Sequence, residues 1–158
     1  MPLADESRDK AFDVCAEVVP GVLETMFFEA LEGSPERAVL PAAERLGIAQ
    51  VRFAGSAQGA LCVAAPEGLL LGLTESFLAC DDPAAASVQA VLVLGELANM
   101  ICGNALSHYQ PNGDFRLATP VTRFHKAVAA ADDVKPDWVR FPLERGSLFV
   151  NLLIEPTS

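Results

Sequence analysis

Positive charge is scarce in this sequence. It contains 11 lysine and arginine residues against 21 aspartate and glutamate residues, for a net charge of −10 at pH 7. Nucleic acids and anionic membranes bind proteins through clustered Lys and Arg, so the sequence argues against both as partners. The charged first ten residues lack the apolar run of a signal peptide, and we expect no apolar stretch of the roughly 18 residues that span a bilayer. We therefore predict a cytoplasmic protein.

Residues that hold metals or act as nucleophiles are also few. The two histidines, His108 and His125, have no second ligand at metal spacing, so we predict no metal site. P-loop, Gly-x-Gly-x-x-Gly and Gly-x-Ser-x-Gly motifs are missing. Four cysteines lie in apolar runs without any Cys-x-x-Cys pair, so we expect reduced, buried thiols. They are Cys15, Cys62, Cys80 and Cys102.

The composition predicts one globular domain over residues 1–158. Hydrophobic residues make up 51% of the chain and charged residues 20%, which is typical of a chain that folds around a core. A chain of this length can bury a core of useful size without a second domain.

Hydrophobic periodicity predicts an α+β fold. After a frayed tail over residues 1–6, a helical pattern runs to Gly33, and Pro20 either kinks one helix or starts a second. Further helices are predicted over residues 69–78 and 87–108, with Ser87 near the N-cap, and helical turns over 36–46. Strands are predicted over residues 50–54, 60–64, 115–118, 121–130, 138–143 and 147–154. We expect two long helices packed on one mixed or antiparallel sheet of about six strands.

The longest helical pattern lies between Ala84 and Gln110, a stretch without proline. Its apolar residues repeat at the spacing of one helix face, which predicts a buried stripe. The stripe consists of Ala90, Val91, Leu94, Leu97, Ala98, Ile101 and Ala105.

Glu96 and Asn99 stand three residues apart on the other face of this helix, together with Leu92, Met100 and Gly103. A solvated strip of a half-buried helix is the commoner explanation of such a pair. The alternative is a site, because an asparagine can orient a water molecule and a glutamate can pair with a cation. This face offers no second acid or base, so such a site requires a partner that supplies the remaining groups.

The two predicted hairpins resemble each other. Val51-Arg52-Phe53 precedes Gly59-x-Leu61-x-Val63, and Val139-Arg140-Phe141 precedes Gly146-x-Leu148-x-Val150. A duplicated helix-plus-hairpin unit, with halves of about 20–83 and 87–158 related by a pseudo-twofold, would explain this echo. Chance similarity between strands rich in Val and Phe remains the other explanation.

Alignment of the two halves places Glu24 on Glu96. Phe27 then takes the place of Asn99, and Leu31 takes the place of Gly103. The first helix thus has a glutamate but no carboxamide three residues later. We predict one site in the chain, not two.

The string Gly95-Glu-Leu-Ala-Asn-Met-Ile-Cys-Gly-Asn104 resembles the signature helix of the CheX/CheC family of chemotaxis phosphatases. In that family a proline follows the Glu-x-x-Asn helix, as Pro120 does here. The family pattern often has Asp or Ser where this chain has Leu92. The resemblance implies a CheC-like layered fold with a pseudo-twofold duplication, and a single site matches the CheX branch.

The resemblance also implies an activity and a partner. Family members dephosphorylate an aspartyl-phosphate on a response-regulator receiver domain such as CheY, which carries its own Mg²⁺ and an active-site lysine. Asn99 would position the attacking water, and Glu96 would pair with the receiver lysine. Phosphoryl transfer depends on positioning and charge placement, so two residues can suffice. No cofactor is expected in this chain itself.

Leu92, Met100 and Gly103 would form the floor of the docking face. The small Gly103 either lets a partner backbone come near or packs tightly against another element of this chain. Asn104 is expected to tie the helix to a loop. A homodimer is expected from the resemblance to the CheX branch and because a sheet must protect its edge strands.

Three functions remain open on the sequence. The first is the phosphatase just described. The second is a non-catalytic receiver-binding or scaffold module that kept the helix and lost turnover, which Leu92 keeps open. The third is a structural domain without a receiver partner. The sequence names neither the cognate regulator nor the pathway.

Overall fold

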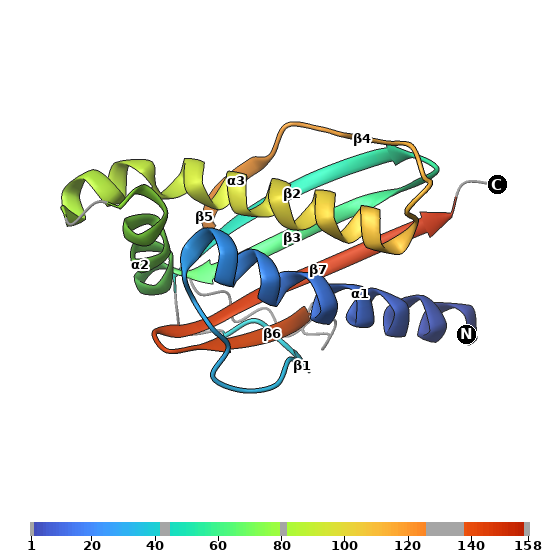
Figure 1. Cartoon of the computed structure of the whole chain (residues 1–158), viewed down its shortest axis with the longest axis horizontal. Helices are drawn as coiled ribbons and strands as arrows, with labels where there is room; N and C mark the ends of the chain where they lie inside the picture. The colour runs from blue at the N-terminus through green and yellow to red at the C-terminus, as the bar shows by residue number, and fades with distance from the viewer. Residues whose placement is uncertain (1, 42–44, 80–81, 126–137, 157–158) are drawn as a thin grey trace.

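Three helices and seven strands form two layers in the computed structural model, which describes residues 2–41, 45–79, 82–125 and 138–156 (Figure 1). Helices α1 (Pro2–Phe27) and α3 (Pro83–Tyr109) cross the same face of the sheet. The shorter α2 (Glu67–Leu78) packs beside them at one end. The α+β class is confirmed, with a third helix in the helical layer.

All strand pairs of the described sheet are antiparallel, in the order β1-β6-β7-β3-β2-β4, with β5 also paired to β2. The hairpins β2–β3 and β6–β7 lie next to each other, so β3 and β7 form the middle of the sheet. The strands are β1 (Glu36–Ala38), β2 (Leu46–Gly55), β3 (Ala57–Pro66), β4 (Phe115–Leu117), β5 (Val121–His125), β6 (Trp138–Leu143) and β7 (Gly146–Pro156).

The echo between the hairpins reappears as burial on the helix-covered face. The Val, Phe and Leu residues of the repeat are all buried, because alternate strand residues face the core. Val63 and Val150, which match in the sequence echo, pair directly across the centre of the sheet. The registers of the two hairpins differ, since Phe53 pairs with Gly59 while Phe141 pairs with Leu148.

Helix α1 differs from its prediction at both ends. It begins at Pro2 and continues through Pro20 as one helix. It ends at Phe27 and not at Gly33, because Phe28 adopts a left-handed backbone with φ of 59° and the amide of Glu29 donates to the carbonyl of Leu23 at 3.1 Å. Leu31 therefore lies beyond the helix, and its predicted equivalence with Gly103 is wrong.

The segment 36–46 and the start of α3 also differ from the prediction. The segment 36–46 contains strand β1 in place of helical turns, and its residues 42–44 lie outside the described part. Helix α3 is capped by Asp82, whose side chain accepts a hydrogen bond from the amide of Ala84 at 3.0 Å, and not by Ser87. Proline in the first turn explains the early start, since its fixed φ suits the helix. The predicted strand 121–130 is described only to His125.

Helix α3 corrects an expectation about apolar stretches. By length and composition alone, the segment Ala84–Tyr109 is long and apolar enough to cross a membrane, the one such helix in the described part of the chain. Half of its most apolar window is buried inside the protein. Its apolar character follows from packing, since the face that carries Leu94, Ala98 and Ile101 is fully buried.

The described cysteines are free thiols. Cys15 and Cys102 are buried, which raises the pKa of each thiol to about 12, and the nearby Cys102 adds to the shift at Cys15. Cys62 is half-buried, and burial raises its pKa as well. The prediction of buried thiols is confirmed for the first two, and Cys80 lies outside the described residues.

Candidate functional site

The middle of α3 separates a buried face from an exposed one. Leu94, Ala98 and Ile101 are buried in the core. Glu96 is exposed and Asn99 is half-buried on the side that faces away from these residues. The helix period therefore brings the two side chains to the surface as neighbours, because residues three apart share a face.

Glu96 and Asn99 open onto a groove of about 560 Å³ between α3 and the connection from β4 to β5. Met100 completes the wall formed by the helix. The opposite wall consists of Leu117, Ala118, Thr119 and Pro120.

Close packing and backbone hydrogen bonds hold the second wall in place. A Cβ atom on Gly95 would lie 3.4 Å from Cβ of Pro120, so the connection lies in van der Waals contact with the helix. The amide of Ala118 donates to the carbonyl of Arg52 at 2.8 Å, and β4 pairs with β2 just before it. The groove is thus bounded by a helix and by a segment anchored to the sheet, which favours a pre-organised surface.

The two polar side chains that α3 contributes to the groove have no partner within the described chain. Neither Glu96 nor Asn99 forms a hydrogen bond or ion pair with another residue of the described ranges. In the same ranges, no three His, Cys, Asp or Glu side chains gather as a potential metal site. The groove offers one carboxylate, one carboxamide, the hydroxyl of Thr119 and apolar contacts, and the first two can bind a cation and orient a water molecule.

The residues predicted to form the docking floor lie around this pair. Leu92 is 65% exposed, and Met100 is half-buried against the core. A Cβ built on Gly103 would meet no atom of another element within 4 Å, so the explanation by tight internal packing is wrong. Asn104 donates to the carbonyl of Met100 at 2.7 Å, which ties it to its own helix and not to a loop.

Sequence reasoning missed three exposed apolar residues on the elements that form or adjoin the groove. Val88 is 75% exposed, Val121 is 63% exposed and Leu117 is 38% exposed. Val88 precedes Leu92 by four residues, so the helical spacing could have indicated that they share a face. The part played by β4 and β5 depends on sheet pairing and carried no local signal.

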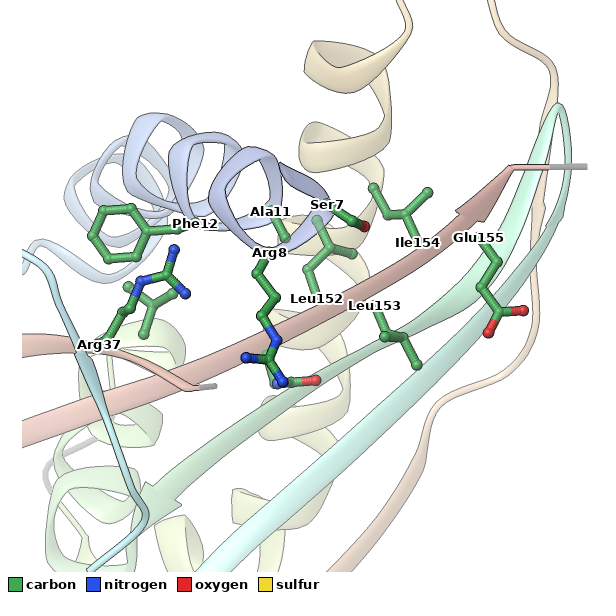
Figure 2. Close-up of a pocket in the computed structure, with 11 residues that line it drawn as sticks. Ser7, Arg8, Ala11, Phe12, Arg37, Leu152, Leu153, Ile154 and Glu155 are labelled. Carbon is green, nitrogen blue, oxygen red and sulfur yellow. The ribbon is translucent and has the colours of Figure 1, made fainter. Parts of the chain in front are cut away.

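A second cavity, of about 400 Å³, lies between the first turns of α1 and strand β7 (Figure 2). Arg37 extends toward it but is ion-paired with Asp9 and lies over the ring of Phe12, 5.4 Å from its centroid. None of the residues predicted as a site contributes to this cavity. It is lined by Ser7, Arg8, Ala11, Phe12, Arg37, Val139, Asn151, Leu152, Leu153, Ile154 and Glu155.

Comparison with known proteins identifies similar sequences and folds. The sequence model of the family described as "Chemotaxis phosphatase CheX" matches residues 48–144, which include the whole of α3. The chemotaxis protein CheX from Vibrio vulnificus is 21% identical, with 94% of this chain and 98% of that chain covered and a TM-score of 0.70.

Two further structures share the fold. In a CheX-CheY-BeF3-Mg²⁺ complex from Borrelia burgdorferi, the matching chain is 21% identical, with 92% of this chain and 97% of that one covered and a TM-score of 0.66. A chemotaxis protein CheX from Desulfovibrio desulfuricans is 19% identical over 93% of this chain and 99% of that chain, with a TM-score of 0.66. No curated protein matches the sequence.

Proposed function

The chain belongs to the CheX family of chemotaxis phosphatases, and we propose that it hydrolyses the aspartyl-phosphate of a response-regulator receiver domain. The observation that carries this proposal is the pair Glu96 and Asn99, which is unpaired within the described chain and opens onto a groove with apolar residues around it. A relative of the same fold is in a complex with CheY. The proposed partner is therefore a CheY-like receiver.

In the proposed reaction, Asn99 holds a water molecule in line with the acyl phosphate. The water oxygen bonds to phosphorus, the bond from phosphorus to the receiver carboxylate breaks, and inorganic phosphate leaves. Glu96 pairs with a lysine of the receiver and fixes its orientation. The Mg²⁺ ion belongs to the receiver and balances phosphate charge, so this chain contributes positioning and needs no cofactor of its own.

Leu92, Met100 and Gly103 form the contact floor in this proposal. Exposed Leu92 and Val88 add apolar area on one side of the pair, and Val121 adds it near the other wall of the groove. Exposed apolar residues around a polar centre are typical of a protein-binding surface.

The second candidate is a non-catalytic module that binds a receiver. Leu92 favours it, because the family pattern often has Asp or Ser there and because this side chain is 65% exposed. Decay of a phosphorylated receiver from the same organism, with and without this protein, distinguishes the two. Acceleration supports the enzyme, whereas binding without any change in decay rate supports the module and rejects the enzyme.

We expect Glu96→Ala to raise the KM for the phospho-receiver by about tenfold, because the substitution removes the proposed ion pair with the receiver lysine. The measurement is the initial rate of phosphate release as a function of receiver concentration. Glu17→Ala, which removes an exposed glutamate of α1, is the matched control and should leave KM unchanged. An unaltered KM in Glu96→Ala would remove the ion pair from the mechanism.

We expect Gly103→Leu to weaken receiver binding by about tenfold or more, since a large side chain would stand where a partner backbone approaches. Gly103→Ala is the control for helix effects. It should raise the free energy of unfolding by about 1 kcal/mol, because alanine favours the helix and a Cβ meets open space. Titration against a receiver loaded with beryllofluoride gives the affinities. Equal affinity in Gly103→Leu and wild type would place the partner elsewhere.

We also propose that the protein forms a cytoplasmic homodimer through a sheet edge. The β6–β7 ladder ends where Val139 pairs with Val150, so among the described residues the end of β7 has no strand paired with it on that side. An open edge of this kind favours pairing with another chain. Light scattering should give the dimer mass at micromolar concentration, and Leu153→Lys should reduce it. A monomer mass for the wild type would contradict the proposal.

A duplication within a single domain over residues 1–158 is our proposal for the origin of the fold. Its support is that the two hairpins lie side by side and meet through the pairing of β3 with β7, where Val63 lies opposite Val150. The strand that precedes each hairpin also pairs with the hairpin of the other half, β1 with β6 and β5 with β2.

A further inference from the structure

The end of α1 carries a side chain that neither the core nor the proposed receiver site uses. Phe28 follows the last helical residue, has a φ of 59° and is 79% exposed. Glycine is the usual residue at this left-handed position, and a bulky side chain there strains the backbone. Because the ring is exposed, it also adds little hydrophobic stabilisation to the fold. Both features lower the stability of the isolated chain, which points to a use for the ring outside the fold.

Other exposed apolar side chains flank the same junction. The rings of Phe27 and Phe77 stack with their centroids 5.1 Å apart and join the end of α1 to the end of α2. Met26 and Phe28 flank one ring in sequence, and Leu78 flanks the other. Met26 is 39% exposed and Leu78 is 41% exposed. We call Met26, Phe28 and Leu78 the helix-end patch.

The charges around the helix-end patch have one sign. Four glutamates lie on the segments that carry it, and none has an ion pair within the described residues: Glu24, Glu29, Glu32 and Glu75. The sequence has no Lys or Arg between Lys10 and Arg37, or between Arg52 and Arg116.

The cations that other segments bring to α2 do not neutralise these carboxylates. Arg45 is paired with Glu67 at 2.6 Å, in the first turn of the helix. Arg145 lies against Gly72, three residues before Glu75 and six before Leu78, and forms no ion pair with Glu75. The patch is thus apolar with an acidic surround.

We propose that the helix-end patch is a docking surface for an amphipathic helix of another protein, with an apolar stripe flanked by Lys and Arg. Apolar anchors with a charged rim suit this mode of recognition, and opposite charges on the rim steer the partner into place. A second copy of this chain fits poorly, because it would bring like charges together. The patch lies on α1 and α2, whereas the receiver groove lies on α3 and the β4–β5 connection.

The test uses a synthetic peptide of about five helical turns, with Leu at i, i+3, i+4 and i+7 and Lys at the other positions. The peptide is titrated into the ¹⁵N-labelled full chain, and amide shifts are recorded. Shifts should concentrate in residues 24–32 and 75–79, and a scrambled peptide of the same composition should not reproduce them. Diffuse shifts, or shifts centred on Glu96 and Asn99, would overturn the proposal.

Phe28→Gly separates docking from stability because its two effects have opposite signs. Relief of the left-handed backbone should raise the midpoint of thermal unfolding by about 2–4 °C. Peptide affinity should fall by about tenfold or more, since an aromatic anchor is lost. Val39→Ala is the control at an apolar residue outside the helix-end patch. Val39 is 40% exposed, and its replacement should leave the peptide affinity unchanged. Unchanged affinity in Phe28→Gly would overturn the proposal, and so would loss of dimer mass in that variant, which would make the occupant a second copy.

Discussion

Replacement of Asn99 by alanine should slow hydrolysis of a cognate phospho-receiver by about 10²-fold or more. The loss corresponds to about 2.7–4 kcal/mol, the usual effect of removing one group that positions or stabilises a transition state. Binding should survive, because the amide acts on the attacking water and not on the receiver surface. The expected signature is a fall in kcat with an unchanged affinity for the receiver loaded with beryllofluoride.

Asn104→Ala is the matched control for this experiment. Asn104 is an exposed asparagine on the same helix, and its amide bonds the carbonyl of Met100 at 2.7 Å. Its replacement removes an equal number of atoms from α3 without touching the groove, so the rate should stay within about twofold of wild type. Full activity in Asn99→Ala would reject the proposed mechanism even if wild-type protein is a phosphatase. Equal losses in both variants would indicate a structural effect on α3.

Phe27→Asn should destabilise the protein by about 3–5 kcal/mol and should not create a second site. The sequence alignment placed Phe27 where α3 has Asn99, but the ring is fully buried and stacks on Phe77. The substitution therefore removes a core aromatic and buries a polar amide. Leu31, which the alignment placed on Gly103, lies beyond the end of the helix and cannot contribute to such a site. Chemical denaturation measures the loss.

Phe28→Asn provides a matched control at the next residue. Phe28 is 79% exposed and left-handed, and asparagine tolerates that backbone well. The free energy of unfolding should stay level or rise, in contrast to Phe27→Asn. A Phe27→Asn variant with wild-type stability and a doubled rate of receiver dephosphorylation would show that α1 can carry a site.

The burial of Cys15 and Cys102 and of most of the apolar stripe agreed with the prediction, because both depend on local chemistry. A stripe at helical spacing must face a core, and the structure buries Leu94, Ala98 and Ile101. The errors fell at helix ends and in short segments. Phe28 adopts a left-handed backbone conformation that glycine usually occupies. The pairing of β1 with β6 joins residues about a hundred positions apart. Such choices are made by tertiary packing and not by local propensity.

The sequence by itself determined the α+β class, the long helix and the common exposed face of Glu96 and Asn99, because each follows from the periodicity of the chain. Only the tertiary structure decided the second wall of the groove, since sheet pairing brings Pro120 against Gly95. It also decided that position 27 of α1 belongs to the core, because the α1–α2 junction buries Phe27. Contacts between distant segments set both outcomes, and their energy depends on shape complementarity that no local pattern records.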